Sequence, residues 1–103
     1  MSAPLPFDDD HAPLYTVGQV ALMLGVQHAF LRRLDSEAVV QPARSEGGQR
    51  RYTRFEIGQV QKVSVLASEG MTLAGIRRVL ELEAQVAGLE HELAAERARH
   101  HRS

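Results

Sequence analysis

A glycine pair, Gly47-Gly48, interrupts a basic segment that runs from Arg44 to Tyr52 between two stretches of helical pattern. Glycine pairs readily adopt the positive φ angles of short β-turns. Val39-Val40 before the turn and Tyr52-Thr53 after it can form short strands, so the segment predicts a β-hairpin. Arg50 and Arg51 at the hairpin exit suit phosphate contact. Taken alone, the hairpin fits a nucleic-acid contact and a solvated surface turn equally well.

Two short helices are predicted before the hairpin. Thr16 and Gln19 fit a capping box at the start of the first helix, and Gly25 fits a left-handed residue at its end. The second helix covers about residues 27–36. The apolar side chains that we expect it to place in the core are Phe30, Leu31 and Leu34. Two short helices joined by a tight glycine turn are typical of a helix-turn-helix.

Two further helices are predicted after the hairpin. Thr53 and Glu56 fit a second capping box, which opens a helix that runs to about Ser68. After Gly70, Thr72 opens a last helix that no proline interrupts from 73 to about 100, although the pattern does not decide whether it is straight or kinked. Its apolar positions follow the 4-3-4 spacing of a coiled-coil seam, formed by Leu82, Val86, Leu89 and Leu93. The seam either joins two copies of the chain or packs back on its own domain, and we favour self-association.

The predicted fold is mainly α: a winged helix-turn-helix with a small β-hairpin wing and a C-terminal coiled-coil helix. Residues 1–13 are expected to form a disordered tail rich in aspartate and proline. Residues 14–80 are expected to form the DNA-binding domain, and 81–103 a dimerisation helix with a frayed end. No signal peptide or membrane span is visible, so we expect a cytoplasmic, nucleoid-associated protein.

The charge distribution supports a polyanionic partner. The whole chain carries a net charge of −1, but residues 27–62 hold seven basic and four acidic side chains, a local excess of +3. The local field, rather than the total charge, steers a protein toward nucleic acid.

Metal binding and catalysis are not expected, and no cofactor is implied. The chain has no cysteine, and its five histidines do not form a ligand pattern. Phe30 and Phe55 are expected in the core rather than on a base-stacking platform. There is no phosphate-binding loop, nucleophile motif or converging carboxylate pair, so we expect a protein that is not an enzyme.

Read in order, these segments resemble the MerR family of bacterial transcription regulators. The family opens with Tyr-Thr-Ile-Gly-Glu-Val-Ala, which corresponds to Tyr15–Ala21 here. Its recognition-helix motif Leu-Arg-Tyr-Tyr-Glu corresponds to Leu31–Asp35, and its wing motif Gly-x-Arg-x-Tyr to Gly48–Tyr52. The run Glu69–Glu83 is similar to the second helical pair of the heat-shock repressor (HspR-like) branch, whose C-terminal tail is not seen in this sequence.

The resemblance implies a homodimer that joins through an antiparallel coiled coil and binds a pseudo-palindromic operator in double-stranded DNA. RNA polymerase or a regulatory protein is a further implied partner. The second helix would enter the major groove, and the wing would contact the flanking backbone or minor groove. Tyr52 would be a phosphate donor or a residue that packs the wing. The expected DNA-binding residues are Thr16, Gln27, His28, Arg32, Arg33, Arg50, Arg51 and Tyr52.

The sequence departs from the family pattern at three places. Arg33 and Leu34 replace the paired aromatic residues of the recognition helix, so either Arg33 takes over a phosphate contact or the contact is lost. Ala38 stands where a glycine is usual. Gln27, His28 and Phe30 stand where small polar residues are commoner, so the DNA sequence that is read cannot be copied from relatives.

Two other function classes remain open on the sequence. One is an excisionase-like DNA-architectural or recombination accessory protein, against which the seam argues. The other is a protein-interaction module whose basic wing is only surface. We also expect no effector domain after the seam, which would leave control to abundance, a partner protein or DNA occupancy. The sequence does not distinguish a repressor from an activator.

Overall fold

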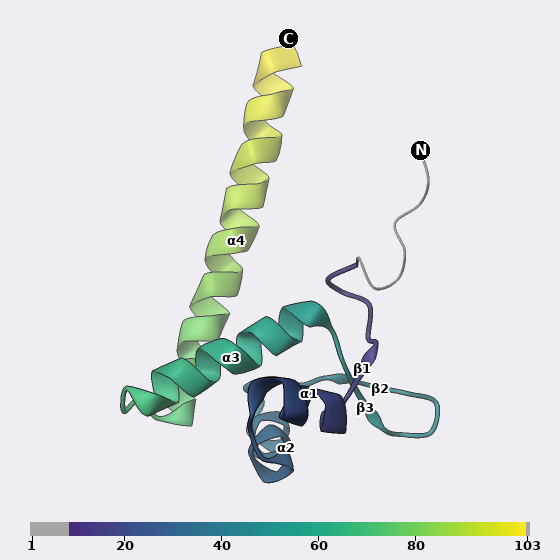
Figure 1. Ribbon diagram of the computed structural model, residues 1–103. Helices are drawn as coiled ribbons and strands as arrows, with labels where there is room; N and C mark the ends of the chain where they lie inside the picture. The colour runs from purple at the N-terminus through teal and green to yellow at the C-terminus, as the bar shows by residue number, and fades with distance from the viewer. Residues whose placement is uncertain (1–8, 103) are drawn as a thin grey trace.

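The computed structural model describes residues 9–102, which form four helices and a small sheet (Figure 1). The elements in chain order are β1 (Tyr15–Thr16), α1 (Val17–Leu24), α2 (His28–Ser36), β2 (Ala43–Arg44), β3 (Arg50–Tyr52), α3 (Arg54–Ser68) and α4 (Leu73–Arg102). The prediction of a mainly helical winged helix-turn-helix with a long last helix is confirmed.

Side-chain caps fix where the helices begin. The Thr16 hydroxyl accepts from the Gln19 amide at 3.1 Å, and the Gln19 side chain accepts from the Thr16 amide at 2.8 Å. Thr53 and Glu56 make the same reciprocal pair at the start of α3, with both distances 2.9 Å. Both predicted capping boxes are therefore confirmed, because each satisfies free amides of a first helical turn with neighbouring residues.

The first three helices end in one type of turn, in which a residue adopts a left-handed conformation. These residues are Gly25, Ala38 and Gly70, with φ angles of 65°, 58° and 95°. The next amide then bonds back into the helix: Val39 donates to the Leu34 carbonyl at 2.8 Å after α2. The bond is typical of a Schellman turn, which favours glycine at the left-handed position. Ala38 is therefore the one strained member of the three.

The sheet has three antiparallel strands in the order β1-β3-β2. Tyr15 lies opposite Tyr52, which ties the start of the helix-turn-helix to the wing. The hairpin turn is closed by the Ser45 amide, which donates to the Gln49 carbonyl at 2.7 Å. The hairpin prediction is confirmed, but the prediction that Val39-Val40 form its first strand is wrong, because both valines are buried in the core before the strand begins.

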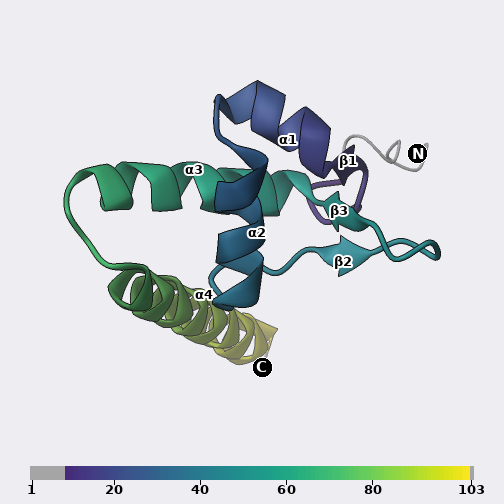
Figure 2. The ribbon, with the colours of Figure 1, turned by 90° about the horizontal axis from the view of Figure 1, so that it is seen from below.

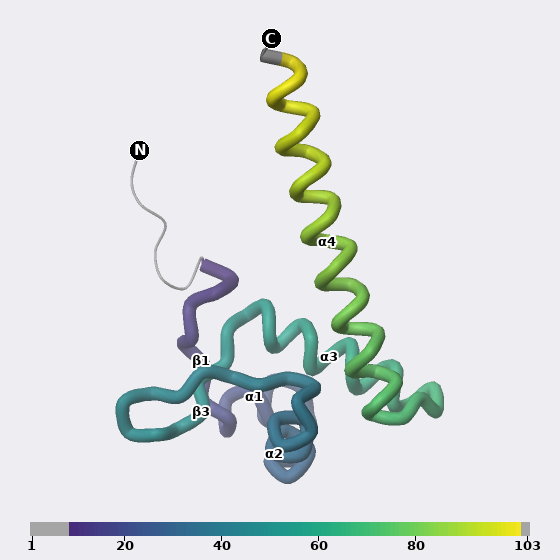
Figure 3. The backbone as a smooth tube through the Cα atoms, turned by 180° about the vertical axis from the view of Figure 1, so that it is seen from behind, coloured from purple at the N-terminus to yellow at the C-terminus, as the bar shows by residue number. Residues whose placement is uncertain are grey.

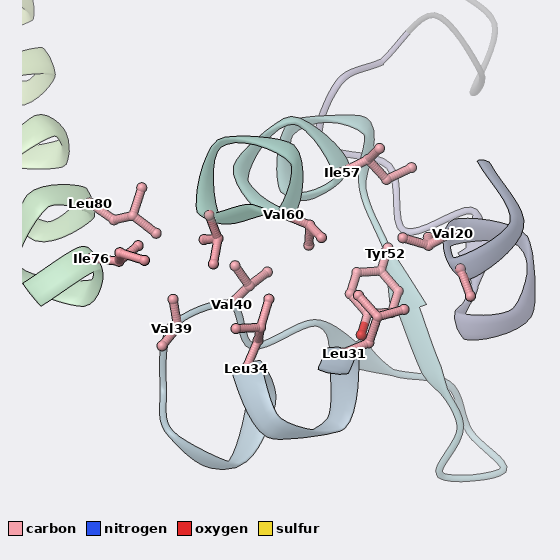
Figure 4. Packing of buried hydrophobic residues seen from close by; sticks show 12 residues of the cluster. Val20, Leu31, Leu34, Val39, Val40, Tyr52, Ile57, Val60, Ile76 and Leu80 are labelled. Atoms are coloured by element: carbon pink, nitrogen blue, oxygen red, sulfur yellow. The ribbon is translucent and has the colours of Figure 1, made fainter. Parts of the chain in front are cut away.

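One small core joins all four helices and the wing (Figure 4). Tyr52 is fully buried, and Leu31 and Leu34 of α2 are 1% exposed. Phe30 packs partly against this cluster, as expected. The prediction that Phe55 enters the core is wrong: its side chain is 52% exposed and its ring lies 5.4 Å from that of His11. The core members are Val20, Ala21, Leu31, Leu34, Val39, Val40, Tyr52, Ile57, Val60, Val63, Ile76 and Leu80.

The segment just before β1 contacts the start of α3. The Phe55 amide donates to the Asp10 carbonyl at 3.0 Å, and Arg54 lies 3.6 Å from the Asp10 carboxylate. Residues 9–13 thus differ from the disordered tail expected over 1–13, whose first eight residues lie outside the described part of the chain.

Helix α4 is one unbroken helix that leaves the domain and projects away from it (Figures 1 and 3). Its first two turns supply Ile76 and Leu80 to the core. Beyond them, Leu82, Val86, Leu89 and Leu93 are 42%, 52%, 64% and 50% exposed. The alternative in which the seam packs back on its own domain is therefore wrong for the described residues.

The left-handed turn at residue 38 yields a stability prediction. In Ala38→Gly the left-handed strain, about 1–2 kcal/mol, disappears, while the greater freedom of unfolded glycine offsets roughly 0.5–1 kcal/mol. We expect a net gain in the free energy of unfolding of about 0.5–1 kcal/mol, measured by chemical denaturation at fixed protein concentration. Ala29→Gly, an exposed helical site in α2, is the matched control and should lose about 0.5–1 kcal/mol. Equal losses in both variants would contradict the strain at Ala38.

Candidate nucleic-acid interface

Helix α2 and the β2–β3 hairpin lie on the same end of the molecule, opposite the C-terminal end of α4 (Figure 1). Viewed from that end, the hairpin extends to one side of α2 (Figure 2). We use "basic face" for a set of residues from this end of the molecule, taken from the start and the exposed side of α2 and from the two hairpin strands: Gln27, His28, Arg32, Arg33, Arg44 and Arg51. It combines a helix end, which can enter a groove of a nucleic acid, with a protruding loop, which can contact the backbone beside that groove.

Helix α2 presents polar side chains outward because Leu31 and Leu34 hold its other side in the core. Gln27 caps the helix through its backbone, and its side chain makes no capping bond. Gln27, His28 and Arg32 are exposed, as the sequence predicted. Within residues 9–102, Arg32 makes no hydrogen bond or ion pair. These three side chains are therefore free to contact a ligand.

Arg33 is also exposed, but it is already engaged. Its Nε lies 2.7 Å from the Glu37 carboxylate one turn later in the helix. Exposed pairs of this kind contribute little stability, about 0.3–0.5 kcal/mol. A phosphate can therefore displace Glu37 at small cost, so Arg33 stays available for backbone contact.

The two wing arginines differ more than the sequence suggested. Within residues 9–102, Arg51 donates to Gln49 and to the Arg50 carbonyl, at 3.4 and 3.2 Å, and makes no ion pair. Arg50 is 22% exposed, and its Nε lies 2.7 Å from Oδ2 of Asp35. Neither arginine therefore stands free at an exposed hairpin exit: Arg50 is paired with Asp35, and Arg51 is itself partly buried. Asp35 is 15 residues away from Arg50 in sequence.

Arg44 is a basic-face residue that the sequence analysis did not single out. It lies opposite Arg50 in the β2–β3 register, and its Nη2 lies 3.0 Å from the same Asp35 oxygen. Arg44, Arg50 and Arg51 border an open hollow of about 400 Å³ together with Thr16, Val17, Gly48 and Gln49. Thr16 keeps its hydroxyl oxygen on the Gln19 amide, while its hydroxyl proton remains able to point into this hollow.

Tyr52 does not belong to the exposed surface. It is fully buried, and within the described residues its hydroxyl has no hydrogen-bond partner. Burial raises the pKa of the phenol above its ordinary value, and the guanidinium of Arg50 partly opposes that shift. Of the two roles expected for Tyr52, phosphate donation is therefore wrong and packing of the wing is confirmed.

Other kinds of site find little support in the described part of the chain. No group of three or more His, Asp or Glu side chains in residues 9–102 is arranged to hold a metal ion. None of the helices there combines the length and hydrophobicity that a membrane span requires.

Comparisons with known proteins identify relatives of this arrangement. Residues 15–83 match the MerR HTH family of regulatory proteins. A putative heat shock protein, HspR, from Streptomyces coelicolor is 37% identical over 86 residues, which cover 82% of this chain and 57% of that protein. The GlnR transcriptional regulator of Bacillus anthracis is 26% identical over 73 residues, or 71% of this chain. The chain thus spans little more than half the length of these relatives.

Solved structures share the fold. The N-terminal part of MtaN, a multidrug transporter activator of Bacillus subtilis, superposes with a TM-score of 0.62 at 24% identity, covering 82% of this chain and 86% of that one. HiNmlR, a MerR family regulator lacking the sensor domain and bound to promoter DNA, superposes with a TM-score of 0.61 at 24% identity over 77% of each chain. SkgA of Caulobacter crescentus gives 0.59 at 27% identity over 86% and 68%. These likenesses each cover more than three quarters of this chain.

The buried phenol of Tyr52 predicts a pH dependence. Because the pKa of Tyr52 is raised in the folded protein, the folded state favours the neutral phenol. This preference contributes fully to the free energy of unfolding below a pH of about 10, the pKa of tyrosine in an unfolded chain. The contribution is lost as the pH rises through the higher pKa of the folded state. Tyr52→Phe should abolish this alkaline loss and leave stability at neutral pH unchanged or slightly higher, because the hydroxyl has no hydrogen-bond partner among residues 9–102. Denaturation across alkaline pH measures the effect, with Tyr15→Phe as the control. A phenylalanine variant with the same alkaline loss as the wild type would contradict the assignment.

Proposed function

Because the chain belongs to the MerR family of helix-turn-helix regulatory proteins, we propose that it binds double-stranded DNA as a homodimer and regulates transcription at a pseudo-palindromic operator. The family is one of regulators rather than enzymes. The observation that carries the proposal is the basic face, on which a recognition helix and a wing project together from one core.

Within this proposal, α2 reads bases and the surrounding arginines hold phosphates. Gln27, His28 and Arg32 stand at the start and on the exposed side of α2, where recognition helices contact base edges. Arginine pairs well with guanine and glutamine with adenine, each worth about 1–3 kcal/mol of discrimination. Arg33, which lies on α2 itself, and Arg51, which lies on the protruding wing, suit phosphate contact.

The exposed seam of α4 supports the homodimer. Four large apolar side chains stand at coiled-coil spacing with no cover from the described domain. Burying each one contributes about 1.5–3 kcal/mol. A second copy of the same helix supplies the complementary surface, and the seam also disfavours the excisionase-like alternative.

The sequence of the seam favours one antiparallel register. If the dyad lies between Leu82 and Val86, each Leu82 meets Val86 of the second copy and each Val79 meets its Leu89. Leu93 then lies over Gly75, which has no side chain to obstruct it. A register one heptad further along would instead set Glu96 against Val79.

Charges on the flanks of the seam favour the same register. It brings Arg78 beside Glu92 of the second copy, a favourable pair, whereas the shifted register brings Arg78 beside Arg99. Glu83 of one copy would approach Glu83 of the other across the dyad. Lys62 lies 2.9 Å from the Glu83 carboxylate of its own chain and offsets the negative charge. The proposed dimer is therefore centred near residue 84, close to the DNA-binding domain.

Base reading by Arg32 can be tested against the neighbouring Arg33. Site selection from random duplexes should return a relaxed motif for Arg32→Ala, because a base contact is lost along with affinity. Arg33→Ala should return the wild-type motif with weaker binding and a salt slope lower by about one. An identical preferred motif from the wild type and Arg32→Ala would rule out base reading by Arg32.

The register can be tested by crosslinking, since the chain has no native cysteine. Gln85 lies beside the proposed dyad, so a short thiol-specific crosslinker should join two copies of Gln85→Cys efficiently. Glu92→Cys is the control. In the proposed register, the two cysteines of this dimer are offset by about 20 Å along the helix axis, so the crosslinker should not join them. Adding Leu89→Asp should abolish both the crosslink and the dimer seen in sedimentation. Equal crosslinking at positions 85 and 92 would indicate a parallel or shifted pair.

A further inference from the structure

Asp35 occupies the last turn of α2 and connects it to the wing. Its Oδ2 oxygen accepts from Arg50 Nε at 2.7 Å and from Arg44 Nη2 at 3.0 Å. The Asp35 side chain is 13% exposed, against 22% for Arg50 and 49% for Arg44. A mostly buried carboxylate that accepts two charged donors forms a stronger contact than an exposed surface pair.

This contact holds both strands of the hairpin. Arg44 belongs to β2 and Arg50 to β3, where the two residues lie opposite each other. Arg44 also donates from Nη1 to the Gly48 carbonyl at 3.4 Å, which extends the connection to the turn. One carboxylate thus ties both strands of the wing to the last turn of α2, in addition to the buried Tyr52 that ends β3. We use "wing clamp" for the set Asp35, Arg44 and Arg50.

The wing clamp also holds two cations that a phosphate would otherwise attract. Two guanidinium groups on one carboxylate leave a local charge of +1, beside the hollow that Arg51 and Thr16 border. A phosphate oxygen competes for the same N–H donors as Asp35. As long as Asp35 keeps them, Arg44 and Arg50 contribute less to binding at arbitrary DNA than two free arginines would.

We propose that Asp35 is a positioning residue, which sets the wing relative to the recognition helix and withholds Arg44 and Arg50 from indiscriminate phosphate binding. The proposal rests on the proposed DNA-binding function. It adds a residue that increases the preference for one DNA site over others without contacting a base. A wing at a fixed angle reaches flanking backbone only when α2 sits at its proper depth and orientation in the groove. The clamp therefore makes full phosphate contact conditional on correct base contact.

Asp35→Asn tests this proposal in the full chain. Binding to a random duplex and to the site selected by the wild type is measured across a salt series. We expect tighter binding to the random duplex, with a salt slope steeper by about one to two because two arginines are released. We also expect a lower ratio of selected-site to random affinity. A merely structural defect would weaken binding to both duplexes and would not steepen the slope.

Glu37→Gln is the matched control, because it removes one carboxylate from the same end of α2 and releases only Arg33. It should raise the affinity for both duplexes alike and preserve their ratio. An unchanged ratio in Asp35→Asn, or a loss of affinity for the random duplex, overturns the proposal.

A second variant and a second readout keep the test decisive if Asp35→Asn does not fold. Arg44→Gln breaks only the half-exposed arm of the clamp and should lower the affinity ratio, and an unchanged ratio counts against the clamp. Without DNA, amide hydrogen exchange at Ser45 and Gly48 should accelerate in Arg44→Gln while core amides stay protected. If the wild type binds neither duplex in a salt-dependent way, the DNA-binding function fails, and the exchange measurement still decides whether the clamp holds the wing.

Discussion

The burial of Tyr52 is the contact on which the rest of the domain depends. This side chain ends β3, yet it lies in the core next to Leu31 of α2 and Val20 of α1 (Figure 4). The core contains no tryptophan and no disulfide, so few large side chains are available to fill it. Placing Tyr52 there draws the wing onto the helix-turn-helix and pairs it with β1. Its hydroxyl finds no hydrogen-bond partner in the described part of the chain, which is unfavourable for a buried polar group. In return, the wing and α2 pack on one shared side chain.

The same core links the basic face to the seam. Ile76 and Leu80 are buried in the domain, and the exposed stripe begins at Leu82 on the same unbroken helix. A continuous helix transmits orientation without a hinge, so two copies joined near residue 84 would hold their recognition helices at a fixed separation. In the proposed dimer, a dyad in the protein would then match a dyad in the operator.

Sequence reasoning succeeded where the determining contacts are local. Both capping boxes and the left-handed residue Gly25 depend on residues three or four apart, and their types are diagnostic. It failed where distant segments meet. The pairing of β1 with β3, the burial of Val39-Val40, and the attachment of Arg50 to Asp35 all join segments that no local pattern connects. The glycine-to-alanine departure at residue 38 was visible in the sequence, but only the φ angle of 58° shows that the backbone conformation is kept.

In the proposed complex, two copies of the basic face, related by a dyad, engage one DNA site. Hydroxyl-radical and dimethyl sulfate footprinting on a duplex selected by the protein tests this most directly. We expect two equivalent protected regions related by symmetry, each with guanine N7 protection where α2 enters the major groove and backbone protection on the wing side. A single asymmetric footprint, or backbone protection without any guanine N7 protection, would contradict it.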